Sequence, residues 1–245
     1  MVAKPSGSRV REGWLRRAER ISDAYGLVLV LVLTTYVLAS LLSNHGWSAV
    51  IITLSASATS VVALTSSEAH RITLNIAIPS SALSVLLAVI GAITGGHLWL
   101  NIASFIEIAL LTLASLAILR RVVTSAEVGF RTILGAISVY TILGILFTFA
   151  YGTIDRLQGG VFFSETAHAK GGDFLFFSYT TLTTTGYGDL VPAGQPGRMV
   201  AGLEMMIGQI FLVTLVAGLV SLWRPGEGLR RRQERRSGKE APVSE

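Results

Sequence analysis

Cysteine is absent from the 245 residues of this chain, which excludes disulfide bonds. Charged residues are scarce as well: they make up 14% of the chain, against 51% hydrophobic residues and a mean hydropathy of +0.60. Soluble domains carry about 25% charged residues, so this composition predicts a membrane protein. The sequence also has no low-complexity repeat and no stretch long enough for a separate soluble domain.

Residue groupings that support catalysis are missing too. The sequence has no nucleophile–base pair, no phosphate-binding loop and no metal-ligand cluster. Three histidines, His45, His97 and His168, fall in separate polar links and lack the spacing of metal ligands. We therefore expect neither an enzyme nor a bound cofactor.

Six long apolar runs are present, and about 20 such residues are needed to cross a bilayer. They cover residues 24–43, 47–66, 72–93, 98–119, 132–152 and 198–223. The first run is too long for a signal peptide and lacks a cleavage site. The expected fold is an all-α integral membrane protein with six transmembrane helices.

Basic residues indicate the orientation of these spans. With both termini in the cytoplasm, 17 lysines and arginines lie on the inner side and 3 on the outer side, as the positive-inside rule requires. We therefore expect a multi-pass protein of the plasma membrane with cytoplasmic N- and C-termini.

Both termini carry basic segments. Residues 1–22 place apolar side chains at helical spacing between arginines, which predicts an amphipathic helix at the cytoplasmic membrane surface. Residues 224–245 contain two arginine clusters, close enough to the bilayer to contact anionic lipid headgroups. Nucleic acid is disfavoured as a partner, because a membrane span follows residue 22 at once.

The most informative motif is the run Thr184-Thr185-Gly186-Tyr187-Gly188, between an aromatic segment and the last apolar run. Glycine reaches left-handed backbone conformations without a Cβ penalty, and Gly186 and Gly188 occupy alternate positions. The run can therefore point successive carbonyls the same way, and the hydroxyl of Thr184 can add a further oxygen ligand. The competing interpretation is a Thr/Gly-rich loop that turns between two helices.

This run resembles the selectivity filter of potassium channels, and residues 132–223 resemble the pore module of that family. The resemblance implies a re-entrant pore helix and a homotetramer, in which three identical subunits complete the pore. It also implies K⁺ binding at Thr184, Thr185, Gly186 and Tyr187, where backbone carbonyls replace the ion's hydration shell.

The resemblance divides the chain into four parts: a cytoplasmic segment 1–22, a voltage-sensor-like domain 23–121, a pore domain 122–223 and a basic tail 224–245. The pore domain is expected to contain an outer helix 132–152, a pore helix 173–183, a filter 184–188 and an inner helix 198–223. In the inner helix, Gly208 matches the gating hinge of the family, and Gln209, Leu212 and Val216 would face the central cavity.

Residues beside the filter partly depart from the family pattern. Asp189 matches the acidic residue at the outer mouth. Phe176 and Phe177 stand where many relatives carry tryptophan; they can pack on Tyr187 but cannot donate an N–H. Thr185 stands where valine is most familiar, and we expect this change to be tolerated.

Glu204 lies about two turns into the inner helix, where a charged carboxylate facing lipid would cost several kcal/mol. We hypothesise that it braces the filter from behind through hydroxyls of the pore helix, such as Thr180 or Thr181, and that its protonation state tunes conduction. The alternative is a glutamate that reaches water and has no special role.

The voltage-sensor-like domain lacks the charges of a voltage sensor. In such sensors the fourth span carries arginines at every third position, whereas here residues 98–119 contain no basic residue. Counter-charges are missing too, because residues 24–67 and 72–106 contain no Asp or Glu. We predict a channel without conventional voltage sensing.

Glu107 is the acidic residue in the middle of the fourth span. One interpretation is a proton- or cation-sensitive switch between helices. The interpretation that we favour from the sequence is a neutral carboxyl group, hydrogen-bonded to a serine or threonine of the Ser/Thr-rich second span.

Taken together, the sequence predicts a potassium-selective channel that conducts K⁺ passively. The intact Gly186-Tyr187-Gly188 sequence argues against a weakly selective cation channel. A subunit of a K⁺ transporter would carry four pore modules with degraded filters, unlike this chain. A non-conducting scaffold or receptor with a vestigial filter is a further alternative.

Overall fold

A computed structural model of the chain describes residues 7–42, 47–67, 71–124, 130–166 and 169–222. The side chains of residues 7–24, 130, 131, 216 and 219–222 are not part of this description. The predicted amphipathic face of residues 1–22, the basic tail 224–245 and the side chain of Val216 therefore lie outside the described residues.

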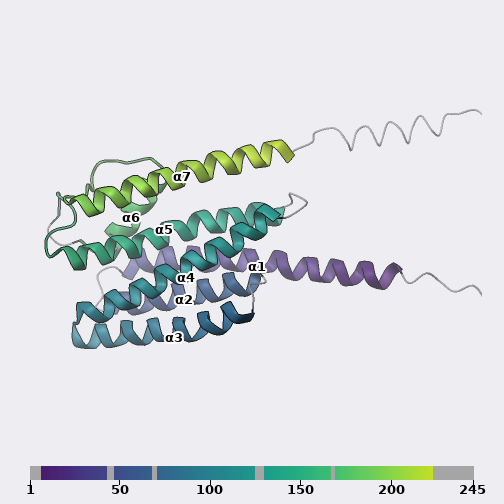
Figure 1. Ribbon diagram of the computed structural model, residues 1–245, viewed down its shortest axis with the longest axis horizontal. Helices are drawn as coiled ribbons and strands as arrows, with labels where there is room; N and C mark the ends of the chain where they lie inside the picture. The colour runs from purple at the N-terminus through teal and green to yellow at the C-terminus, as the bar shows by residue number, and fades with distance from the viewer. Residues whose placement is uncertain (1–6, 43–46, 68–70, 125–129, 167–168, 223–245) are drawn as a thin grey trace, which may run out of the picture. The chain divides into compact units, whose positions relative to one another are not determined.

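All regular secondary structure in these residues is helical (Figure 1). The helices are α1 (Gly7–Leu42), α2 (Ser48–Ser66), α3 (Arg71–Thr94), α4 (His97–Thr124), α5 (Phe130–Gln158), α6 (Gly171–Leu182) and α7 (Gln195–Leu222). All except the 12-residue α6 are long and apolar enough to cross a membrane. The prediction of six spans is confirmed at this level, and the chain is a multi-pass membrane protein.

Several helix boundaries differ from those expected. The helix α1 continues from the basic segment into the first span without a break, and no proline interrupts it. The helix α5 ends at Gln158, six residues beyond the expected 152. The helix α7 begins at Gln195, because Pro196 is tolerated in the first turn of a helix, where its missing N–H needs no partner.

Residues 1–211 form one compact unit and residues 212–245 another. In the first unit, α1 to α4 form a bundle in which α2 contacts α1, α3 and α4, and α3 also contacts α4. The helix α5 packs on α1 and α4, and α6 packs on α5 and α1. The bundle is therefore joined directly to the first helices of the pore segment. Of the second unit, only the end of α7 up to Leu222 is described.

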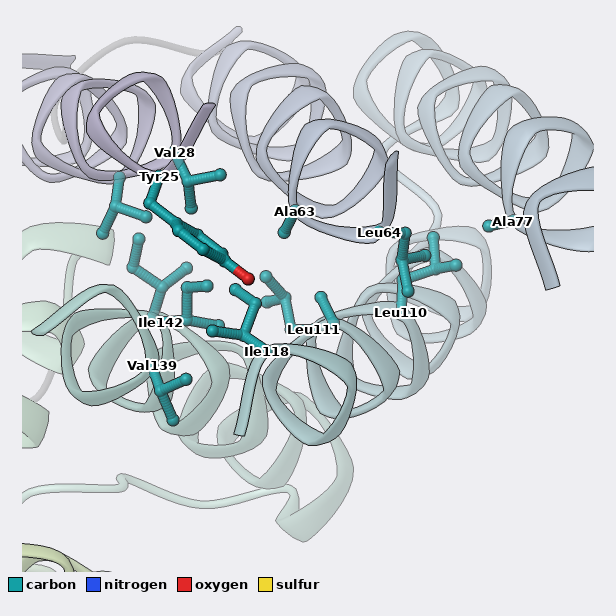
Figure 2. Close-up of a cluster of buried hydrophobic side chains, with 13 residues drawn as sticks. Tyr25, Val28, Ala63, Leu64, Ala77, Leu110, Leu111, Ile118, Val139 and Ile142 are labelled. Atoms are coloured by element: carbon teal, nitrogen blue, oxygen red, sulfur yellow. The ribbon is translucent and has the colours of Figure 1, made fainter. Parts of the chain in front are cut away.

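A buried apolar core joins α1 to α5, as Figure 2 shows. Its labelled members are Tyr25, Val28, Ala63, Leu64, Ala77, Leu110, Leu111, Ile118, Val139 and Ile142. Because lipid tails are as apolar as leucine, close packing rather than removal from water holds such helices together. The small buried residues of α2, such as Ala56, Ser60 and Ala63, allow the close approach that this packing needs.

Candidate ion-conduction site

The filter run begins directly at the C-terminal end of α6. The N–H of Thr184 donates to the carbonyl of Thr181 (2.9 Å), and the N–H groups of Thr185 and Gly186 donate to the carbonyl of Thr180 (2.8 and 3.1 Å). These bonds use carbonyls that the end of a helix leaves without partners. Through its N–H groups, they also fix the start of the predicted filter to α6, which corresponds to the pore helix that the sequence predicts.

Along the filter run, residues with a left-handed backbone conformation alternate with residues that have an ordinary, negative φ. Thr184, Gly186 and Gly188 have positive φ values of 56°, 49° and 79°. Among the described residues, Thr184 is the one non-glycine residue with a positive φ. The predicted left-handed conformations at Gly186 and Gly188 are thus confirmed, and the simple loop interpretation does not account for this regular alternation.

Side chains around the filter are open to solvent in the single chain. Residues 183–189, including Asp189, are exposed, and Tyr187 is 71% exposed. The ring of Phe176 stacks on that of Tyr187, with centroids 6.0 Å apart and planes inclined by 11°. The structure therefore places Phe176 beside the filter, as expected.

Phe177 does not share this position, so the expectation for it is wrong. Its ring packs against Tyr151, Phe162 and Phe163, with centroids 4.9, 6.2 and 5.3 Å away. Successive residues of a helix point about 100° apart, so only one of the two adjacent phenylalanines can face the filter. Phe177 instead belongs to a buried aromatic cluster behind the pore helix.

The segment before α6 contacts the chain that follows the filter run. The N–H of Ala193 donates to the carbonyl of Phe162 (2.8 Å), and the N–H of Ser164 donates to that of Val191 (3.0 Å). At the start of α7, Nε of Arg198 donates to the carbonyl of Pro192 (3.0 Å). The chain on both sides of the filter is therefore held together at this end.

Glu204 lies behind the pore helix and is fully buried, at 0% exposure. Its Oε2 accepts a hydrogen bond from the Tyr151 hydroxyl on α5 (2.5 Å), and its Oε1 accepts one from the Ser178 hydroxyl on α6 (2.6 Å). Ser178 Oγ is also 2.8 Å from the carbonyl oxygen of Gly144. The glutamate therefore links α7 to both α5 and the pore helix.

The expectation that Glu204 bonds to a hydroxyl of α6 is confirmed, but the residue is Ser178 rather than Thr180 or Thr181. Thr180 donates to the carbonyl of Phe177 (3.0 Å), and it points away from Ser178 because two residues of a helix are about 200° apart. Thr181 is buried, but it lies one turn closer to the filter than Ser178. Ser178 shares the spacing of Thr181 on the buried face of α6, a signal that was visible in the sequence; Tyr151 gave no comparable signal.

Gly208 of α7 lies against the end of the pore helix. A Cβ atom at this position would lie 2.2 Å from the carbonyl oxygen of Leu182. The same oxygen accepts a hydrogen bond from the Tyr140 hydroxyl of α5 (3.1 Å). Close packing therefore requires glycine here, and α7 continues through it without a break. The hinge role of Gly208 stays a prediction.

The other residues expected to line the central cavity follow Gly208 on α7. Gln209 is exposed, and Leu212 is half-buried within the second unit. Their place along a pore stays a prediction, as does that of Val216.

The hydrogen bonds of Glu204 predict that mutations of Glu204 and Tyr151 have non-additive effects on stability. Glu204→Leu should destabilise the protein by about 1–3 kcal/mol, because the buried Tyr151 hydroxyl loses its acceptor, whereas Ser178 can still donate to the carbonyl of Gly144. Glu204→Gln should cost less, because the amide oxygen can still accept. Tyr151→Phe should lower stability in the same direction, and the double variant Tyr151→Phe/Glu204→Gln should cost less than the sum of the single changes. Thermal unfolding in detergent measures this; strictly additive effects would show that the two residues act independently.

Comparison with known proteins adds one finding to this geometry. Residues 140–224 match a family model described as "Ion channel". No curated protein and no solved structure matches the chain. The matched residues include most of α5, the pore helix α6, the filter run and all of α7. Residues 140–224 are therefore similar to an ion-channel family, in agreement with the resemblance of the filter run to that of potassium channels.

Proposed function

We propose that this protein is a potassium-selective channel that conducts K⁺ passively through a filter formed by residues 184–188 of four identical chains. The alternation of left-handed residues at Thr184, Gly186 and Gly188 carries the proposal. Such alternation turns successive carbonyl oxygens to one side of a strand, and rings of these oxygens replace the hydration shell of K⁺. The carbonyls of residues 184–187 and the Thr184 hydroxyl bind the permeating ion.

The exposure of the filter favours an assembly of several chains. Non-helical backbone at membrane depth is tolerated only where protein buries it or where it lines a water-filled path. Residues 183–189 are exposed in the single chain, so further copies must surround the path that they line. Four copies supply the fourfold ring of carbonyls that a potassium filter uses.

A stripe on α7 fits the same assembly. Met199, Leu203, Met206 and Ile210 are exposed and follow one another at spacings of four, three and four residues. This is the spacing of apolar residues in helices that pack lengthwise on other helices. The stripe lies on the helix that follows the filter, so copies of the same chain that bring their filters together also bring these faces together.

The remaining parts of the proposal concern membrane context and gating. The channel lies in the plasma membrane with both termini in the cytoplasm, where their arginines contact anionic lipids. Its open probability does not depend steeply on voltage, because α4 has no basic residue between His97 and Arg120.

Ion flux into proteoliposomes of the purified chain tests the function. We expect K⁺ flux to exceed Na⁺ flux by about tenfold or more, which corresponds to a preference of at least about 1.4 kcal/mol. Tyr187→Ala removes the ring that stacks on Phe176 and should abolish this preference, whereas Tyr187→Phe retains the ring and should keep it.

Two outcomes would overturn the proposal. Equal K⁺ and Na⁺ flux would indicate a weakly selective cation channel, for which the absence of an N–H donor on Phe176 offers a physical reason. No flux from an intact tetramer at any voltage or pH would favour a non-conducting scaffold or receptor.

A further inference from the structure

Glu107 of α4 lies at the centre of the four-helix bundle and is 0% exposed. Its Oε1 accepts hydrogen bonds from the hydroxyls of Ser57 on α2 and Ser84 on α3, the latter at 2.5 Å. The expectation of a hydroxyl partner on the second span is thus confirmed. Its Oε2 is buried and has no hydrogen-bond partner among the described residues.

Counter-charges are distant from this carboxyl group. The membrane-spanning part of α2 contains no charged residue, and α3 contains only Arg71, at its first position. On α4 itself, Arg120 and Arg121 follow Glu107 by 13 and 14 residues, which is roughly 20 Å of helix. A carboxylate without a counter-charge at this depth is expensive, so the group must bind a cation or move to one.

Arg156 of α5 is the cation nearest to Glu107 along the polar face of α4. Its Nε donates to Asn101 Oδ1 (2.6 Å) and its Nη2 donates to Ser104 Oγ (2.7 Å). Asn101, Ser104 and Glu107 follow at every third position and are all buried. Arg156 therefore holds the first two members of a polar stripe, of which Glu107 is the third.

A cavity of about 240 Å³ lies next to these residues, between the bundle, α5 and the start of α6. Thr53, Ser104, Asp155 and Arg156 are among its lining residues. Thr53 precedes Ser57 by one turn on α2, and Ser104 precedes Glu107 by one turn on α4. The cavity thus ends one turn away from the carboxyl group on both helices.

We propose that Glu107, with Ser57 and Ser84, is a proton-binding site, and that Arg156 becomes its counter-charge when the proton leaves. In the arrangement described, the proton is on Oε2, because both serine hydroxyls donate to Oε1. Once ionised, Glu107 moves to the guanidinium of Arg156 beside the cavity. A screw motion of α4 by three residues, about 4.5 Å along its axis with a rotation of about 60°, brings Glu107 to the position that Ser104 occupies.

A proton fits this site better than a metal ion does. One carboxylate and two hydroxyls offer few oxygen ligands, whereas Ca²⁺ takes about 6–8 and Mg²⁺ requires near-octahedral coordination. Among the described residues, no group of three His, Asp or Glu side chains could hold a metal ion.

The positions of the charges are the reverse of those in a voltage sensor. Here the acidic residue, Glu107, is on the fourth helix, and the cation, Arg156, is on α5 of the pore segment.

Infrared difference spectra of the full-length protein in lipid, recorded across a pH titration, test this proposal without reference to ion flux. We expect a protonated-carboxyl band that disappears on alkalinisation and is absent from Glu107→Gln. In Ser57→Ala and Ser84→Ala the band should persist but shift to higher frequency, because the C=O group loses a hydrogen-bond donor. The spectrum of Glu204→Gln identifies the band of the other buried carboxyl group, and Glu165→Gln, an exposed acid, should keep the Glu107 band.

The role of Arg156 has its own readout in the same experiment. In Arg156→Gln the Glu107 band should persist to higher pH than in the wild type, because the ionised form loses its counter-charge. Arg120→Gln makes the same charge change at an exposed position of α4 and should leave the titration unchanged. Asp155 and His97 are the other titratable residues at the outer ends of α5 and α4, so Asp155→Asn and His97→Gln are included as controls.

Two results would overturn the inference. A wild-type spectrum with no band that Glu107→Gln removes would show that the group does not hold a proton. A titration unaffected by Arg156→Gln would show that Arg156 is not the counter-charge. Both readouts are independent of what the pore conducts, so their failure is distinguishable from failure of the proposed channel function.

Discussion

Replacing Gly186 with alanine is expected to abolish K⁺ flux while the protein still assembles in the membrane. Gly186 has a φ of +49°, and no heavy atom lies within 4 Å of the position that a Cβ would occupy. The cost is therefore one of backbone conformation: a left-handed residue with a Cβ costs about 1–2 kcal/mol, and each chain of the assembly carries that cost. The chain avoids it by returning to an ordinary φ, which turns a filter carbonyl away from the ion path.

Gly159 provides a matched control for this variant. It also has a positive φ, +66°, and no atom within 4 Å of a Cβ position, but it lies just after the end of α5 rather than in the filter. Gly159→Ala should carry the same backbone cost and retain K⁺-selective flux. Proteoliposome flux, normalised to the amount of assembled protein, compares the two. Equal flux from Gly186→Ala and Gly159→Ala would mean that the left-handed filter backbone is not needed for conduction.

Replacing Gly208 with alanine is expected to destabilise the protein and to remove most of the flux. The new Cβ would lie 2.2 Å from the carbonyl oxygen of Leu182, and that atom belongs to backbone rather than to a flexible side chain. Either α7 or the end of the pore helix must move, and overpacking of this kind costs about 1–3 kcal/mol. Movement of Leu182 would also strain its hydrogen bond with Tyr140 and shift the start of the filter.

Gly202 is the matched control on the same helix. No heavy atom lies within 4 Å of its Cβ position, so Gly202→Ala should be neutral or stabilising, because alanine favours a helix over glycine by about 1 kcal/mol. Thermal unfolding and flux are measured for both variants. If Gly208→Ala unfolds at the same temperature as Gly202→Ala, the packing account of Gly208 is contradicted and a hinge role gains support.

The sequence predicted those features that depend on local pattern. The six spans follow from the length of apolar runs, and the left-handed residues Gly186 and Gly188 follow from glycine at alternate positions. The type of hydrogen-bond partner of Glu107 was also predicted: a serine or threonine hydroxyl of the second span, which is rich in both residues.

Features that depend on how one helix is rotated against another were not predictable. The spacing on α6 left open which hydroxyl meets Glu204, and the structure selects Ser178 rather than Thr180 or Thr181. Phe177 faces the aromatic cluster for the same reason. The link from Arg156 to Asn101 and Ser104 joins residues more than fifty positions apart, and no local pattern reveals such a contact.

The zero-current potential across a planar bilayer, with K⁺ on one side and Na⁺ on the other, tests the central claim most directly. The account predicts a large potential, with the K⁺ compartment negative, because K⁺ leaves through the filter and Na⁺ does not replace it. A conducting protein that gives a potential near zero would contradict the account, since residues 184–188 would then pass both ions alike.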